Sequence, residues 1–218
     1  MGAFLDTLTD NWSLFLDAFW NTIRLFVFAG IGSLAFGLVL AAMRVSPVPA
    51  FRVFGTGYVG LLRNTPLTLV FFFVAFGFPY LQINFSFFVF AVFALTAYTS
   101  AFVCEAVRSG INTVATGQAE AARAIGLTFG QSLRYVILPQ AIRAVVPPLT
   151  SIMNALLKNT TVAAGFSVAE AGAIRANLSE LGYPAIDGLL WVVIGFLILV
   201  LPLSALQHGL ERRWRVSR

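Results

Sequence analysis

The chain has 218 residues, of which 59% are hydrophobic and 11% charged, and its mean hydropathy is +0.87. A chain of this composition has too little polar surface to cover a soluble globule, so we expect an all-α integral membrane protein. The net charge of +5 does not indicate nucleic-acid binding, because the basic residues are scattered at the ends of apolar runs, as orientation in a membrane requires.

Several kinds of chemistry are excluded by residues that the chain lacks. One cysteine, Cys104, cannot form an internal disulfide, and one histidine, His208, leaves no His/Cys metal cluster. The only lysine, Lys158, follows no glycine-rich loop, so a phosphate-gripping ATPase motif cannot form. We therefore expect no enzyme activity and no cofactor in this chain, and any ATP has to be hydrolysed by another polypeptide.

Two spans are predicted first, at residues 17–43 and 53–78, each longer than the roughly 20 residues that cross a bilayer core. The second is interrupted at residues 63–66, Arg-Asn-Thr-Pro, because proline disfavours helix at the residue before it. Two interpretations stand. A new half-helix begins near Pro66 and directs free N–H groups at a carboxylate, or the helix is only kinked and Arg63 reaches the headgroups.

A third span is predicted at residues 87–107, close to an ionisable pair. Glu105 and Arg108 are three residues apart, so on a helix they can neutralise each other near the membrane surface. A glutamate inside a span is by default a functional candidate, and the pairing alone also explains it.

The most polar internal stretch, residues 117–139, lies inside a loop at residues 109–139. Thr116 is a candidate N-cap, Gly126 is placed to end the helix, and Thr128 with Gln131 matches a capping box. The pattern predicts two short helices joined at a glycine. An alanine-rich helix of this kind has little bulk and suits a groove on a partner.

The last two spans are predicted at residues 141–157 and 186–206, and residues 162–184 are too polar to span, so we expect a re-entrant or interfacial helix there. Five spans place the termini on opposite sides of the membrane. Ten of the fourteen basic residues fall on the side of the polar loop. By the positive-inside rule, this loop and the C-terminus are cytoplasmic and the N-terminus is outside.

The motifs Glu120-Ala121-Ala122, then Gly126, then Ile137-Leu138-Pro139 resemble the EAA signature of permease subunits of bacterial ATP-binding cassette (ABC) importers. The resemblance covers nearly the whole chain and extends to the polar amino acid subfamily, most closely to glutamate uptake permeases of actinobacterial type. Further matching stretches are residues 63–67, 109–111, 117–122 and 157–161.

This resemblance implies a multi-pass cell-membrane protein that moves a polar amino acid, glutamate above all, into the cytoplasm. It also implies three partners: an ATPase dimer that binds ATP and magnesium, a second permease subunit that is a copy or a paralogue, and an extracytoplasmic solute-binding protein. Coupling to the ATPase is expected at Glu120, Ala121, Ala122 and Gly126. Candidates for the substrate path are Arg63, Thr65, Thr68, Tyr98, Glu105, Asn159 and Thr160.

Two other classes of function stay open. The first is a secondary transporter or channel that works without ATP, although the chain shows no inverted repeat and few ionisable residues for a proton relay. The second is a membrane enzyme or an assembly subunit, although no catalytic set of side chains stands out.

Overall fold

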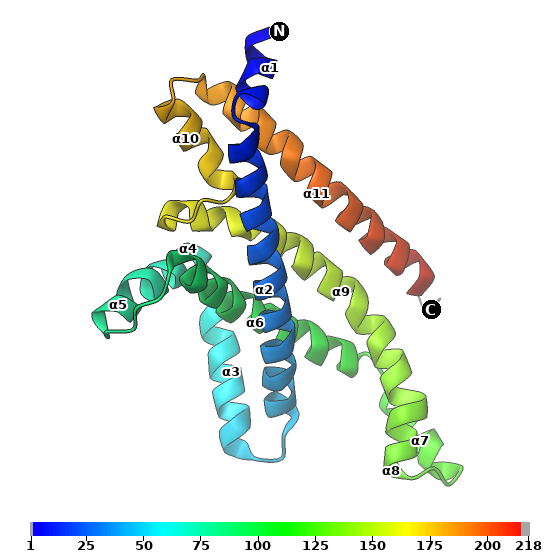
Figure 1. The fold of residues 1–218 in the computed structure, drawn as a ribbon. Helices are drawn as coiled ribbons and strands as arrows, with labels where there is room; N and C mark the ends of the chain where they lie inside the picture. The colour runs from blue at the N-terminus through cyan, green and yellow to red at the C-terminus, as the bar shows by residue number, and fades with distance from the viewer. Residues whose placement is uncertain (1, 215–218) are drawn as a thin grey trace.

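A computed structural model describes residues 2–214, and their regular structure is helical throughout (Figure 1). Arg215 and Arg218 of the predicted basic tail lie outside the described residues. In chain order the elements are α1 (Gly2–Thr9), α2 (Trp12–Val45), α3 (Pro49–Arg63), α4 (Leu67–Phe72), η1 (Phe73–Gly77), α5 (Phe78–Tyr80), α6 (Phe87–Asn112), α7 (Thr116–Ala124), α8 (Phe129–Ser132), η2 (Leu133–Ile137), α9 (Leu138–Asn159), η3 (Thr160–Phe166), η4 (Ala171–Ala173), α10 (Ile174–Glu180) and α11 (Ala185–Trp214).

Four helical stretches of the described chain are long and apolar enough to cross a membrane: α2, α6, Phe129–Phe166 and Ala185–Glu211 within α11. A fifth span is possible if α3 and Leu67–Tyr80, which meet at 109°, cross together. The prediction of an all-α membrane protein with about five spans is confirmed. The side of the membrane on which each terminus lies stays a prediction.

The predicted break at residues 63–66 is present, and local side chains stabilise it. Asn64 donates from Nδ2 to the carbonyl of Gly60 at 2.7 Å, and Thr65 donates from Oγ1 to the carbonyl of Leu61 at 2.8 Å. These bonds add side-chain donors to carbonyls in the last turn of α3, where the regular backbone pairing ends. Pro66 then becomes the N-cap of α4, where its missing N–H costs nothing.

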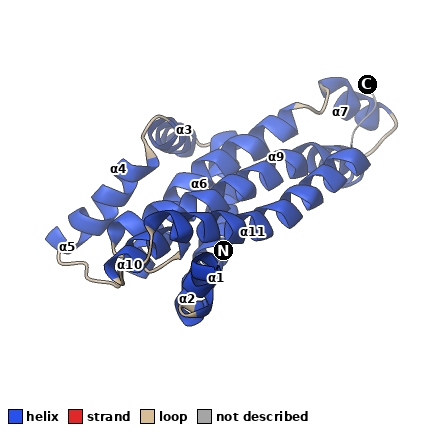
Figure 2. Cartoon of the chain, turned by 90° about the horizontal axis from the view of Figure 1, so that it is seen from above, coloured by secondary structure: helices blue, strands red, loops and turns tan. Residues whose placement is uncertain are grey.

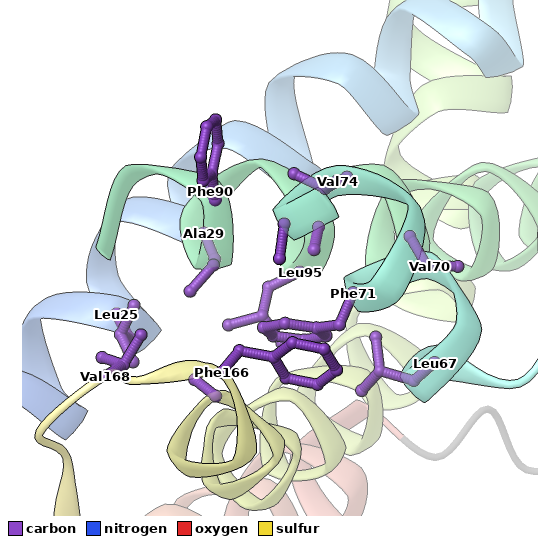
Figure 3. Packing of buried hydrophobic residues seen from close by; sticks show 14 of the residues in the cluster. Leu25, Ala29, Leu67, Val70, Phe71, Val74, Phe90, Leu95, Phe166 and Val168 are labelled. Atoms are coloured by element: carbon purple, nitrogen blue, oxygen red, sulfur yellow. The ribbon is translucent and has the colours of Figure 1, made fainter. Parts of the chain in front are cut away.

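The core forms where α2, α4 and η3 meet α6, and α9 packs on α6 with α11 outside it (Figure 2). Figure 3 shows Phe71 of α4 against Phe166 of η3, with Leu95 and Ala29 beside them; the two rings are stacked with centroids 5.0 Å apart. Phe71, Leu95 and Ala29 are buried almost completely. This contact brings the broken span and the segment after α9 to the same part of α6.

Gly37 lets α2 approach α6. A β-carbon at this position would lie 2.5 Å from Cγ1 of Val103 and 3.0 Å from the carbonyl of Ser100. We expect Gly37→Ala to destabilise the fold by about 1–3 kcal/mol, because the helices must separate or Val103 must leave its rotamer. Gly57 of α3 has nothing within 4 Å of its own β-carbon position, which makes Gly57→Ala the matched control. The thermal midpoint in detergent measures both, and equal midpoints would contradict this account of the packing.

Glu170 fixes the segment between η3 and η4 to α2. Its carboxylate is fully buried and accepts bonds from the N–H of Gly172 at 2.8 Å and from Oγ1 of Thr22 at 3.2 Å. The same Thr22 oxygen accepts the N–H of Ala171 at 3.0 Å. The region predicted as one re-entrant or interfacial helix is therefore three short helices folded against α2 and α11. The first, η3, ends the spanning stretch Phe129–Phe166, and η4 and α10 lie outside the spanning stretches.

Burial raises the pKa of Glu170 to about 7, although the hydrogen bonds from Gly172, Thr22 and Ala171 oppose the shift. The folded state therefore keeps a proton that the unfolded chain has already lost between about pH 4.5 and 7. We expect the free energy of unfolding to fall by on the order of 2 kcal/mol as the pH rises through this window. Glu170→Gln should flatten the fall, which thermal midpoints at pH 5 and pH 8 would reveal. Glu180 is exposed, so Glu180→Gln is the control. If Glu170→Gln kept the pH dependence of the unsubstituted protein, Glu170 would not be its source.

Candidate functional site

The polar segment contains the predicted short helix α7, and a second helix begins at Phe129, where the capping box predicts it. The prediction that this second helix is short is wrong, because α8, η2, α9 and η3 form one helical stretch over Phe129–Phe166. The capping box is present: Thr128 accepts the N–H of Gln131 at 3.3 Å, and the Gln131 side chain accepts the N–H of Thr128 at 2.9 Å. The predicted N-cap at Thr116 is wrong by one residue. Ala115 has the extended backbone of an N-cap, so Thr116 is already inside the helix and its side chain makes no capping bond.

The turn between the two helices depends on Gly126, whose φ is +86°. Its N–H donates to the carbonyl of Arg123 at 2.9 Å, and the next N–H, of Leu127, donates to the carbonyl of Ala122 at 3.1 Å. This pair of bonds closes α7 and requires a left-handed residue, which glycine adopts without strain.

The α7–α8 segment lies at the opposite end of the molecule from α1 and α10 (Figure 1). Glu120, Ala121 and Gly126 are exposed there, whereas Ala122 faces inward and is only 4% exposed. Two large apolar side chains stand out beside them, Ile125 at 79% exposure and Phe129 at 67%. Apolar side chains gathered on an exposed short helix are typical of a surface that a partner covers.

A second feature is a charged cluster where α2, α3 and α6 meet. Oε2 of Glu105 lies 2.6 Å from Nη1 of Arg44 and 3.6 Å from Nη1 of Arg63. Its other oxygen accepts a hydrogen bond from Arg108, so the predicted pair is confirmed and is part of a larger group. The structure thus brings together two predicted path residues, Arg63 and Glu105.

Two cavities lie beside this cluster. The larger, about 470 Å³, is bordered by Arg44, Arg63, Glu105 and Arg108, and the smaller, about 260 Å³, lies between α6 and α9. Arg63 and Glu105 line both, as does Phe102. The Arg63 side chain therefore stands at the boundary between the cavities, where its position affects both.

Comparison with known proteins decides the family. Residues 33–216 match the family of binding-protein-dependent transport system inner membrane components. The chain belongs to this family. It is 41% identical over 217 residues to the glutamate transport system permease GluC of Corynebacterium glutamicum, with 93% of this chain and 95% of that protein covered.

Other relatives of the permease agree with this assignment. It is 38% identical to the probable glutamine ABC transporter permease GlnM of Bacillus subtilis, covering 96% of this chain and 97% of that one. A solved amino acid ABC transporter with histidines matches its fold with a TM-score of 0.89 at 28% identity, over 94% of this chain and 96% of that chain. The permease is thus a multi-pass inner-membrane component of a transport system.

The other predicted path residues are not gathered at the charged cluster. Thr65 is half-buried and its hydroxyl is bonded to the backbone, whereas Thr68 in the first turn of α4 is exposed. Tyr98 packs against the aromatic core. Asn159 is half-buried, and Thr160 is fully buried with its hydroxyl donated to a backbone carbonyl at 2.8 Å.

Sequence reasoning missed a polar link between the last two spans of the permease. Nδ2 of Asn154 donates to Oε1 of Gln207 at 2.6 Å, and Nε2 of Gln207 lies 2.7 Å from Oγ of Ser151 and 2.9 Å from Oε1 of Glu211. An asparagine and a serine inside the predicted fourth span were the available signal. Within residues 2–214, no group of three or more His, Cys, Asp or Glu side chains gathers to hold a metal.

Proposed function

We propose that the permease carries glutamate, or a closely related acidic amino acid, into the cytoplasm as the membrane component of an ABC importer. Three observations support this: membership of the family, the similarity to a glutamate transport system permease, and the arginine-rich cluster, which suits an anionic solute. In this proposal the α7–α8 end faces the cytoplasm and the N-terminus faces outside.

The exposure of α7 is the observation that supports coupling between the permease and an ATPase. Glu120, Ala121, Ala122 and Gly126 form the element that an ATPase dimer holds, with ATP and magnesium bound by that dimer. A second permease subunit completes the path, and a binding protein delivers the solute from outside. ATP binding then shifts a two-state equilibrium because the ATPase dimer binds the two permease conformations with different affinity.

Reconstitution tests this proposal. Proteoliposomes that contain the permease, its second subunit and the ATPase should take up labelled L-glutamate only when both ATP and the binding protein are supplied. The competing hypothesis is that the permease is a secondary transporter. Glutamate uptake by the permease alone, driven by an ion gradient, would favour that hypothesis and overturn the importer proposal.

We place the substrate path along Arg63, Thr65, Thr68, Tyr98, Glu105, Asn159 and Thr160, with the start of α4 as one carboxylate contact. The N–H groups of Leu67 and Thr68 open this helix after Pro66, and its positive end favours an anion. Replacing Thr65 and Thr68 together with valine should lower glutamate uptake several-fold, or change substrate preference, with the ATPase still bound. Thr9→Val is the control because Thr9 makes similar backbone bonds on the remote α1. Unchanged uptake and preference would discredit this contact.

A further inference from the structure

The cluster around Glu105 carries more positive charge than it neutralises. Arg44, Arg63 and Arg108 surround a single carboxylate, which leaves a formal excess of two positive charges. Unbalanced charge in a membrane protein is costly unless it meets water, a counter-ion or a substrate. The excess therefore points to an anion as the missing component of this site.

Arg63 is the member of the cluster that is available to a ligand. Its side chain is 44% exposed, and its distance of 3.6 Å from Glu105 is too long for a hydrogen bond. Among the described contacts, its guanidinium makes no hydrogen bond and lies over the Phe102 ring, 5.9 Å from the centroid. An arginine presents several donors in a planar fork that fits a carboxylate, and these donors are unused here.

A second arginine, Arg108, borders the same cavity with a side chain that is 35% exposed. Its guanidinium bonds Glu105 through Nη2, whereas its Nε is buried and has no hydrogen-bond partner among the described groups. A buried donor without an acceptor is unfavourable, and a shift of this side chain toward an incoming oxygen would relieve it. Polar side chains of Thr56 and Asn64 also border the cavity of about 470 Å³, which lies within the size range of small-molecule sites.

We propose that this cavity binds the side-chain carboxylate of the acidic amino acid in transit, with Arg63 as the main donor and Arg108 as the second. The inference rests on the proposed function and adds where the permease itself recognises the charge of its substrate. Glu105 serves as a fixed counter-charge that holds Arg44 and Arg108 in place between passages. Since Arg63 borders both cavities, its movement between Glu105 and the ligand would link them.

The test is direct binding to the assembled transporter, purified in a neutral detergent without the binding protein. The probe is radiolabelled L-glutamate, and L-glutamine is the neutral competitor of the same shape. We expect saturable binding that unlabelled L-glutamate displaces and L-glutamine does not. Arg63→Gln should weaken binding tenfold or more, and Arg63→Lys should weaken it less, since it keeps the charge and loses the fork. Arg52→Gln is the matched control, because Arg52 is an exposed arginine of the same helix outside both cavities.

Three results would overturn the inference. Binding could be unaffected by Arg63→Gln, it could fall equally in Arg52→Gln, or glutamate could fail to bind. A further arm adds phosphatidylglycerol, because a lipid phosphate offers similar chemistry: lipid binding that needs Arg63 and that glutamate cannot displace would assign the site to lipid. ATP-driven glutamate uptake by the wild-type proteoliposomes, measured in parallel, separates the two claims. Uptake without Arg63-dependent binding contradicts only this inference, whereas the absence of uptake contradicts the proposed function.

Discussion

Replacing Gly126 with valine is expected to lower the rate of ATP-driven uptake at least about tenfold, while the permease remains folded in the membrane. The φ of +86° at Gly126 is strained for any L-residue by roughly 1–2 kcal/mol and by more for a β-branched one. Space is not the obstacle, since nothing lies within 4 Å of a β-carbon there. The turn must therefore open and move α7, and a change of about 1.4 kcal/mol in coupling free energy is already a factor of ten.

Gly182 provides a control with the same strain. Its φ is +85°, open space surrounds it, and its N–H and that of Tyr183 close α10 with the same pair of bonds that closes α7. It lies at the other end of the molecule, in the loop between α10 and α11. Gly126→Val should weaken ATPase co-purification with the permease, and Gly182→Val should not. Equal effects of the two variants on ATPase attachment would show that strain alone, and not coupling, is measured.

Glu105→Ala is expected to cause the largest loss of stability. It leaves Arg44 and Arg108 facing each other without their shared carboxylate, which we expect to cost roughly 2–4 kcal/mol. This lies below the range of a fully buried pair because the Glu105 side chain is 23% exposed. A lower thermal midpoint and a lower yield of monodisperse transporter in detergent would report the loss.

Glu180→Ala is the control for this prediction. Glu180 is an exposed glutamate at the end of α10, and it takes part in none of the ion pairs found among the described residues. Its removal should leave the midpoint within the error of the measurement. If Glu105→Ala were as stable as Glu180→Ala, the cluster would not hold α2, α3 and α6 together.

Features set by short stretches of sequence could be predicted, because neighbouring residues determine them. The turn at Gly126, the capping box at Thr128 and the break before Pro66 all follow from local backbone chemistry. The pair of Glu105 and Arg108 follows from helical spacing. The N-cap before α7 was misplaced because it depends on how the chain leaves α6, which the local motif does not determine.

Contacts between distant segments could not be predicted from a single sequence. Arg44 meets Glu105 across 61 residues, and Thr22 meets Glu170 across 148. Residues 162–184 are polar enough to be predicted outside the spans, and the sequence does not indicate that one of these polar side chains, Glu170, is fully buried against α2. The length of an apolar run indicates that a helix spans a membrane, and it does not indicate which face meets which neighbour.

We propose that α7 is the contact through which a separate ATPase drives the permease, and cysteine crosslinking tests this contact most directly. Cys104, the only cysteine of the chain, is replaced by serine, and Ala121→Cys is introduced on the exposed face of α7. Glu180→Cys on α10 is the control at the other end. The account predicts that a short crosslinker joins position 121, and not position 180, to the ATPase in the assembled transporter. Labelling of position 121 from outside intact cells, or an assembled complex in which it never reaches the ATPase, would contradict it.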